Sequence, residues 1–358
     1  MAMAMAKAPN GQPPQRQIIP FRKNTQQRIQ MNQDDNSKAH VLGSTVNYRI
    51  DKYGGLAGLF FWLYGTVTLS NTGALANLAP WNIVSRFKLT LNNNANVICD
   101  FDGFHCWSLA QTLLNTWGPA GGGNFTPNSV VYVAPTANGA NTWAIPFYIP
   151  ISLNLGSDVL TGMINMQSQQ ANLVLSVTLV TTGTDVVTNF SSLSLTGELH
   201  NVFYELRKGT EPPPLILVTS QQKTETIGAV GLTKHEIVPQ GDLYSLVMTA
   251  ILNSARNSAN ITDIQFRSSG SHYDYIMNPR INHLKYEMDY QKPAPTGVFT
   301  LDFFHAMELP NWGDERDVIR TNNFTKLEAL LNVASGATLG GSGTDRFEIV
   351  ERRIVPLG

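Results

Sequence analysis

Residues 171–181 read ANLVLSVTLVT, and this stretch decides the fold class. From Leu173 to Leu179 every second residue is a large apolar one, while Ser176 and Thr178 fall on the other side. A period of two residues is typical of a β-strand with one buried face. The pattern predicts a strand in a sandwich, with half of its side chains in a core.

Similar runs of β-branched and aromatic residues continue in both directions, bounded by Gly, Pro and Asn clusters, and predict an all-β protein. Helices are expected only at Gly103–Asn115, after an Asp102 cap, and at Pro279–Tyr290, after an Asn278 cap. The expected strands are Thr45–Ile50, Leu59–Leu69, Ser85–Leu91, Val97–Phe101, Ser129–Val133, Thr142–Ile151, Ala171–Thr181, Ser192–Arg207, Leu215–Val218, Gln222–Ala229, Leu243–Asn253, Ile261–Ser268, Gly297–Phe304, Phe324–Val333 and Arg346–Val355.

A run of three prolines, Pro212-Pro213-Pro214, divides the 358 residues into two halves. Three prolines fix an extended segment that fits neither a helix nor a central strand. The halves follow one order of elements: in each, an Asn-Ile pair (Asn82, Asn260) follows a long strand and a helix comes later. The sequence therefore predicts two tandem β-sandwiches. The expected units are an arm (1–40), a first sandwich (41–211), a linker (212–214) and a second sandwich (215–358).

Charge is scarce, at 14 % of the residues, against roughly 25 % in an ordinary domain. A surface poor in charge favours a protein covered by other subunits; an extracellular polar sandwich is the alternative. The start, Met1 to Lys7, lacks the apolar core of a signal peptide, and no apolar run is long enough to cross a bilayer. Cys99 and Cys106 make no disulfide framework. We therefore expect a protein made in a reducing cytoplasm.

The positive charge gathers at the N-terminus, where residues 1–33 contain no acid. No Lys or Arg occurs from Leu89 to Leu206, so a contact with a polyanion is expected only in the arm. The arm itself is predicted to be disordered, with a short helix allowed at Thr25–Gln33. Its basic residues are Lys7, Arg16, Arg22, Lys23 and Arg28.

Clusters of reactive side chains are few. Cys99, Asp100, Asp102, His105 and Cys106 lie together, but they lack the paired spacing of a zinc site. The pair His235-Glu236 lacks the second histidine of a zincin, and Pro239 would break the required helix. The sequence therefore predicts no catalytic residue, no metal site and no cofactor.

Aromatic residues concentrate in the expected strands, and core packing is a better use for them than a sugar-binding platform, which would need exposure. The residues concerned are Phe60, Phe61, Trp62, Tyr64, Trp81, Trp107, Trp143, Phe147 and Tyr148.

Two stretches carry a family likeness. The first runs from LFFWLY (59–64) to APWNIVSRF (79–87); the second is FYIPI (147–151) followed by DVLTG (158–162). An apolar strand, an A-P-x-N-[IL]-[IV]-x-R motif, a [YF]-x-[IV]-P strand and an acidic turn follow one another in this order. The sequence resembles the double jelly-roll major capsid proteins of tectiviruses, tail-less phages with a membrane inside an icosahedral capsid.

The resemblance implies a double jelly roll and a homotrimer whose six sandwiches form a pseudo-hexagonal capsomer in an icosahedral shell. It implies contacts with neighbouring capsomers and with minor capsid, vertex and membrane proteins of the virion, and an N-terminal arm that faces the internal membrane. Binding of a specific nucleic-acid sequence is not expected. Assembly would take place in the host cytoplasm. A carbohydrate-binding two-domain β-sandwich protein is the alternative from another class, and a glycosidase is weaker because nothing selects a carboxylate pair.

Overall fold

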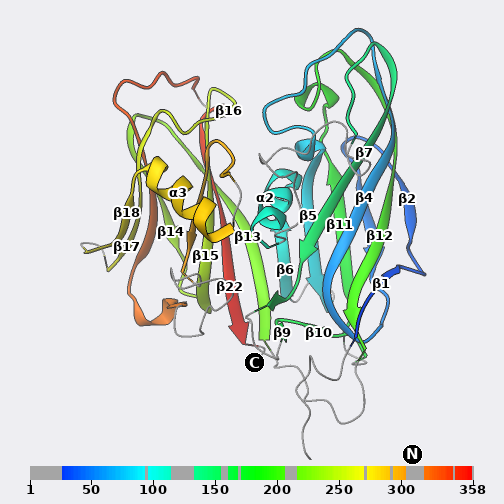
Figure 1. Ribbon diagram of the computed structural model, residues 1–358, viewed down its shortest axis with the longest axis horizontal. Coiled ribbons are helices and arrows are strands. Elements are labelled where there is room, and N and C mark those ends of the chain that lie inside the picture. The colour runs from blue at the N-terminus through cyan, green and yellow to red at the C-terminus, as the bar shows by residue number, and fades with distance from the viewer. Residues whose placement is uncertain are drawn as a thin grey trace, which may run out of the picture.

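The computed structural model contains two β-sandwiches side by side (Figure 1). None of the helices in the described part of the chain is long and apolar enough to span a bilayer. The structure describes residues 26–92, 96–113, 133–154, 160–167, 171–205, 216–269, 272–290, 293–303, 318–341 and 343–356.

The first sandwich has two antiparallel layers, whose main strands are ordered β2–β12–β4–β7 and β3–β11–β5–β6. The short strands β1 (Gln27–Met31) and β10 (Ile164–Asn165) add to the first layer and bring it to six strands. Consecutive strands alternate between the sheets in the manner of a jelly roll, except that β5 and β6 are neighbours in one sheet. Its strands are β2 (Ser37–His40), β3 (Thr45–Arg49), β4 (Gly55–Leu69), β5 (Val84–Leu91), β6 (Asn96–Phe101), β7 (Gly139–Pro150), β11 (Leu173–Leu179) and β12 (Phe190–Tyr204), with the short strands β8 (Leu153–Asn154), β9 (Leu160–Thr161) and β10 (Ile164–Asn165).

The second sandwich repeats this connectivity, with sheets ordered β13–β22–β15–β19 and β14–β21–β17–β18. Strand for strand, the positions in the two sheets match those of the first sandwich. Its strands are β13 (Ile216–Thr226), β14 (Gly231–Ile237), β15 (Asp242–Leu252), β17 (Ile261–Ser268), β18 (His272–Met277), β19 (Val298–Asp302), β21 (Leu327–Val333) and β22 (Arg346–Pro356), with the short strands β16 (Ala255–Arg256) and β20 (Ile319–Arg320).

Each sandwich also carries one α-helix at the same place in its connectivity. Helix α2 (Gly103–Leu113) lies between β6 and β7, and α3 (Pro279–Tyr290) lies between β18 and β19. Both caps predicted from the sequence are present: Asp102 Oδ1 accepts the His105 amide at 2.8 Å, and Asn278 Oδ1 accepts the Ile281 amide at 2.9 Å. The predicted internal repeat is thus confirmed in the connectivity.

The last part of the arm, residues 27–40, corrects one expectation. Where a short helix was allowed, Gln27–Met31 forms strand β1, which pairs antiparallel with β12, and β2 pairs further along the same strand. A strand added to a sheet edge is held by main-chain hydrogen bonds and needs no apolar pattern, so no residue pattern marked it. Buried Asn32 fixes the junction: its Oδ1 accepts the Asp51 amide at 2.9 Å and its Nδ2 donates to the Arg49 carbonyl at 2.7 Å.

Other predicted elements agree with small shifts. The two strands expected at Leu215–Val218 and Gln222–Ala229 are one continuous strand, β13. The edge strands β14 and β18 were not predicted, because each is short and has charged residues within it. The predicted strand Ser129–Val133 and the proline linker lie outside the described residues, except Val133, which makes an isolated bridge to Ala144.

The two sandwiches share one sheet. Strand β13 of the second pairs in parallel with β6 of the first, Ser220 opposite Cys99 and Gln221 opposite Asp100. This pairing joins the β3–β11–β5–β6 sheet to the β13–β22–β15–β19 sheet, and with the short strands β16 and β20, which pair with β15, ten strands form one sheet. The shared sheet places α2 between the sandwiches, whereas α3 lies on the second one (Figure 1).

Candidate functional site between the two sandwiches

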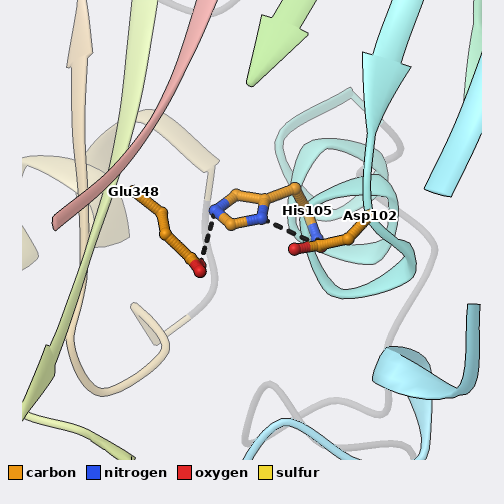
Figure 2. A group of neighbouring side chains, drawn as sticks. All are labelled: Asp102, His105 and Glu348. Atoms are coloured by element: carbon orange, nitrogen blue, oxygen red, sulfur yellow. Dashed lines mark hydrogen bonds and ion pairs between the residues drawn. The ribbon is translucent and has the colours of Figure 1, made fainter. Parts of the chain in front are cut away.

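The densest group of ionisable side chains lies where α2 meets the second sandwich. His105, in the first turn of α2, sits between Asp102, which caps the same helix, and Glu348 on β22 (Figure 2). The imidazole is wholly buried and the Glu348 carboxylate nearly so. Two of the three residues come from the cluster noted in the sequence, and the third comes from the other half of the chain.

The contacts of the imidazole are defined on both sides. Its Nδ1 lies 2.9 Å from Asp102 Oδ1, and its Nε2 lies 3.1 Å from the buried Thr249 hydroxyl and 3.8 Å from Glu348 Oε2. Glu348 in turn accepts a hydrogen bond from Arg346. The other oxygen of Asp102 accepts a hydrogen bond from Gln222 of β13 at 2.9 Å.

These contacts set the charge of the group. Burial alone would lower the pKa of His105, but the Asp102 and Glu348 carboxylates outweigh it and raise that pKa above its ordinary value. Burial would raise the pKa of Asp102, but the His105 charge and hydrogen bonds lower it. The two carboxylates therefore favour the protonated form of His105, and the group links α2 to β15 and β22.

The geometry limits what chemistry the group can do. One ligand atom from each of Asp102, His105 and Glu348 lies within 4.8 Å of the other two, close enough to share a metal ion, but each ring nitrogen already faces one of the two carboxylates (Figure 2). The order Asp102, His105, Thr249 resembles a nucleophile with its base and orienting acid. Thr249 and His105 are both fully buried, however, so a substrate cannot reach the hydroxyl. The arrangement serves to hold the two sandwiches together.

Apolar and cationic contacts surround this polar centre. Val247, Val298 and Val350 of the second sandwich belong to the same continuous buried cluster as the core of the first. Arg256 of β16 lies over the Phe104 ring of α2, 5.0 Å from its centroid, and its Nε donates to Asn77 at 3.1 Å. The outer face of α2 is thus covered by the second sandwich.

The remaining residues of the cluster noted in the sequence are structural. Cys99 and Cys106 are free and buried, and burial raises the pKa of both thiols. Cys106 donates to the Tyr148 carbonyl at 3.3 Å. Asp100 forms an ion pair with Arg86 through both oxygens, 2.6 and 2.5 Å, on the surface of the shared sheet.

The His235-Glu236 pair lies on strand β14, not on a helix. Nδ1 of His235 is 2.8 Å from Glu225 and Nε2 is 2.7 Å from Glu351, which also accepts two hydrogen bonds from Arg353. Burial would lower the pKa of His235, but the bonds to Glu351 and Glu225 raise it. The contacts of His235 join the two sheets within the second sandwich.

Of the arm residues singled out in the sequence, Arg28 is described: it lies on β1 and forms an ion pair with Glu205 at 3.0 Å. Its role in facing a membrane stays a prediction. The other four basic residues and the three linker prolines lie outside the described residues, namely Lys7, Arg16, Arg22, Lys23, Pro212, Pro213 and Pro214.

The sequence did not identify Thr249 or Glu348. Each is a single polar residue on an outward strand position, which reads as solvent-facing until another sandwich is known to cover it. The one available signal was that Glu348 interrupts an apolar strand, FEIV, between Arg346 and Glu351.

Comparison with known proteins gives one consistent result. No family model and no curated protein matches the sequence. Among solved structures, the major capsid protein of Sulfolobus turreted icosahedral virus (STIV) superposes with a TM-score of 0.68 at 13 % identity, covering 92 % of this chain and 97 % of that one. VP54 of PBCV-1 gives 0.65 at 9 % identity, covering 93 % and 95 %. The major capsid protein P2 of bacteriophage PM2 gives 0.53 at 9 % identity, covering 93 % and 98 %.

These likenesses establish the fold. The chain is a double jelly roll of the kind found in viral major capsid proteins, and the fold class predicted from the sequence is confirmed.

Proposed function

We propose that this chain is the major capsid protein of an icosahedral virus, with a structural and non-enzymatic role. Three copies form a capsomer in which six sandwiches make a pseudo-hexagon, and such capsomers tile the shell. The neighbours of the trimer in the virion are other capsomers and the minor capsid, vertex and membrane proteins.

One observation carries this proposal: two sandwiches of identical connectivity stand side by side in one chain and share a ten-stranded sheet. Solved viral major capsid proteins have this fold over nearly their whole length. A rigid pair of equivalent sandwiches supplies two of the six positions of a hexagon, so that three chains complete it. The linker Pro212-Pro213-Pro214 is proposed to restrict the angle within the pair.

The N-terminal arm is proposed to face the internal membrane. Each basic residue near an anionic bilayer contributes about 1 kcal/mol, so one arm binds only weakly. Three arms on one trimer act together and gain by avidity. Deleting residues 1–25 should keep the trimer and abolish its salt-sensitive binding to phosphatidylserine liposomes. Equal binding by the truncated and full-length trimers would refute this role.

Sedimentation of the full chain tests the assembly proposal directly. A trimer of about 118 kDa, three times the 39.3 kDa of one chain, should persist on dilution through the micromolar range. Negative-stain microscopy should then reveal hexagonal particles. A monomer that remains monomeric in mild buffer at high concentration would overturn the proposal.

A carbohydrate-binding role is the second candidate, and one observation favours it. Strand β4 presents the aromatic residues Phe60, Trp62 and Tyr64 on one face, and all three are at least partly exposed. Sugar rings can bind by stacking on a row of exposed aromatic side chains. Retention of the protein on glycan columns, lost on Trp62→Ala, would support this function, and the absence of retention on a glycan array would refute it.

A further inference from the structure

Helix α3 presents its apolar side chains outward. Ile281, Leu284 and Met288 are 51 %, 53 % and 59 % exposed. Their spacing of three and four residues aligns them in one stripe along the helix. The opposite, buried face carries Asn282 and Tyr286 instead. An ordinary amphipathic helix buries its apolar face and exposes its polar face. In the isolated chain, α3 does the reverse.

Polar contacts fix α3 in this orientation. Asn282 donates to the Thr300 carbonyl at 2.8 Å and accepts the Thr300 amide at 3.1 Å. The Tyr290 hydroxyl donates to Asp302 at 2.6 Å. Turning the stripe inward would break these hydrogen bonds. The stripe therefore remains available for a partner.

The internal repeat indicates what covers it. Helix α2 packs on β5 and β7, and α3 packs on β17 and β19, which are the equivalent strands of the second sandwich. The outer face of α2 is covered by the β13–β22–β15–β19 sheet, through the contacts of His105 and Phe104 with the second sandwich. By equivalence, the face of α3 should meet the corresponding sheet of a first sandwich, which is β2–β12–β4–β7.

That sheet has a suitable surface. Along β4, residues 59, 61 and 63 point into the core, and Phe60, Trp62 and Tyr64 point outward. Phe60 pairs across to Tyr148, with ring centroids 4.9 Å apart, and Met31 continues the same row through β12. Tyr64 and Met31 are 36 % and 41 % exposed. In the described part of this chain, the row is an aromatic surface that no second sandwich covers.

The sheet of β4 and β12 and the helix α3 lie on opposite sides of the molecule (Figure 1). One chain therefore cannot bring its own stripe and its own aromatic row together. Two different surfaces that join copies head to tail close into a ring when the rotation per copy allows it. Two equivalent sandwiches per chain require three copies for a six-membered ring.

We infer that the α3 stripe of one copy packs on the outward aromatic row of strand β4 in the next copy. This inference rests on the proposed function and names the contact that closes the trimer. Buried apolar and aromatic anchors of this kind dominate the stability of interfaces.

The test uses two variants with one defective surface each: Leu284→Glu on the stripe and Tyr64→Glu on the row. Either variant alone should lose the trimer in sedimentation at micromolar concentration, with a roughly 30-fold or larger weakening of association. Circular dichroism should retain the β signal, because both positions are solvent-exposed. Met288→Glu repeats the stripe test at a second exposed position. Val238→Glu, at a position 63 % exposed but off the stripe, is the matched control and should stay trimeric.

Mixing the two variants gives the decisive readout. A head-to-tail contact leaves one intact stripe and one intact row in the mixture, so native mass spectrometry should detect one-to-one dimers that neither variant forms alone. A Leu284→Glu variant that remains trimeric, or a mixture that stays monomeric, would overturn the inference. The proposed function would still stand in that case, provided that the wild type is trimeric. A monomeric wild type would overturn both.

Discussion

The two sandwiches have the same connectivity but different interiors. The first is packed with large rings; fully buried examples are Tyr48, Phe61, Phe87, Phe101, Phe104, Trp107, Trp143 and Phe147. The second has fewer rings and more buried charge; its buried charged residues include Glu328, Glu348, Glu351, Arg352 and Arg353. Strand pairing, rather than the chemistry of the core, therefore determines the jelly roll.

Histidines illustrate the same difference. In the first sandwich His40 lies beside Tyr48 and Phe61, and burial lowers the pKa of His40 to about 4, so that the ring is neutral. In the second, His235 is held between two glutamates and its pKa is raised. The aromatic core around His40 holds a neutral ring, whereas the core around His235 pairs charges, so the two regions should respond differently to mutation and to pH.

The largest effect is expected from the aromatic core. Phe147 packs against Phe61, Phe87 and Trp81, with centroid distances of 6.3, 5.0 and 5.8 Å. Phe147→Ala should cost about 4 kcal/mol, because it removes a buried ring and leaves a cavity. Urea unfolding measures the loss, and peptide-resolved hydrogen exchange should assign it to the first sandwich. The exposed control Val41→Ala should change little; an equal loss in both sandwiches would contradict the comparison.

Breaking the buried ion pairs of the second sandwich should have the next largest effect. Glu351→Gln removes the negative charge shared by His235 and Arg353, and should cost about 3 kcal/mol because it leaves two cations buried without it. Faster hydrogen exchange in β14 and β22 is the expected signature. Glu236→Gln, an exposed change on β14, is the control. If exchange accelerates first in β4 and β12, the assignment of stability to these pairs is wrong.

Acidification should weaken the first sandwich selectively. His40 has a folded pKa of about 4 and an unfolded value of about 6.5, so the folded form loses stability as pH falls between them. From pH 7 to pH 5 the loss is about 2 kcal/mol. His235 has a raised folded pKa, so its contribution is complete below about pH 6.5 and is lost only as pH rises above that.

His40→Gln separates these contributions. Glutamine can keep the bond to the Tyr48 hydroxyl, 2.9 Å in the wild type, but it does not titrate. The variant should not show the loss of stability that the wild type shows between pH 7 and pH 5. Urea unfolding measures this loss, and peptide-resolved hydrogen exchange assigns it to a region. Identical pH profiles for variant and wild type would remove His40 as the cause.

The smallest effect is expected at the contact between the sandwiches. Thr249→Val removes one hydrogen bond to His105 Nε2 and should cost about 1 kcal/mol. Exchange should accelerate at α2 and β15 but not in the cores. Thr224→Val, an exposed change on β13, is the matched control. Unchanged hydrogen exchange at α2 would mean that the contact between α2 and β15 does not depend on the Thr249 hydroxyl.

The amino-acid sequence was sufficient for the features that depend on neighbours along the chain. The period of two in 171–181 identified its strand, and Asp102 and Asn278 marked the starts of both helices. These features follow from local backbone geometry and capping, which a short window contains. The two sandwiches were predicted from the repeated order of elements, which can also be followed along the chain.

Tertiary structure alone decided which surfaces meet. Strand β1 was read as part of a disordered or helical arm because its pairing is supplied by the backbone of β12, which is far away in the sequence. Glu348 and Thr249 reach His105 across more than 140 residues, and outward strand positions look alike whether water or another sandwich covers them. The spacing of Ile281, Leu284 and Met288 defines an apolar stripe on α3, but only packing against β19 decides that this side is turned outward.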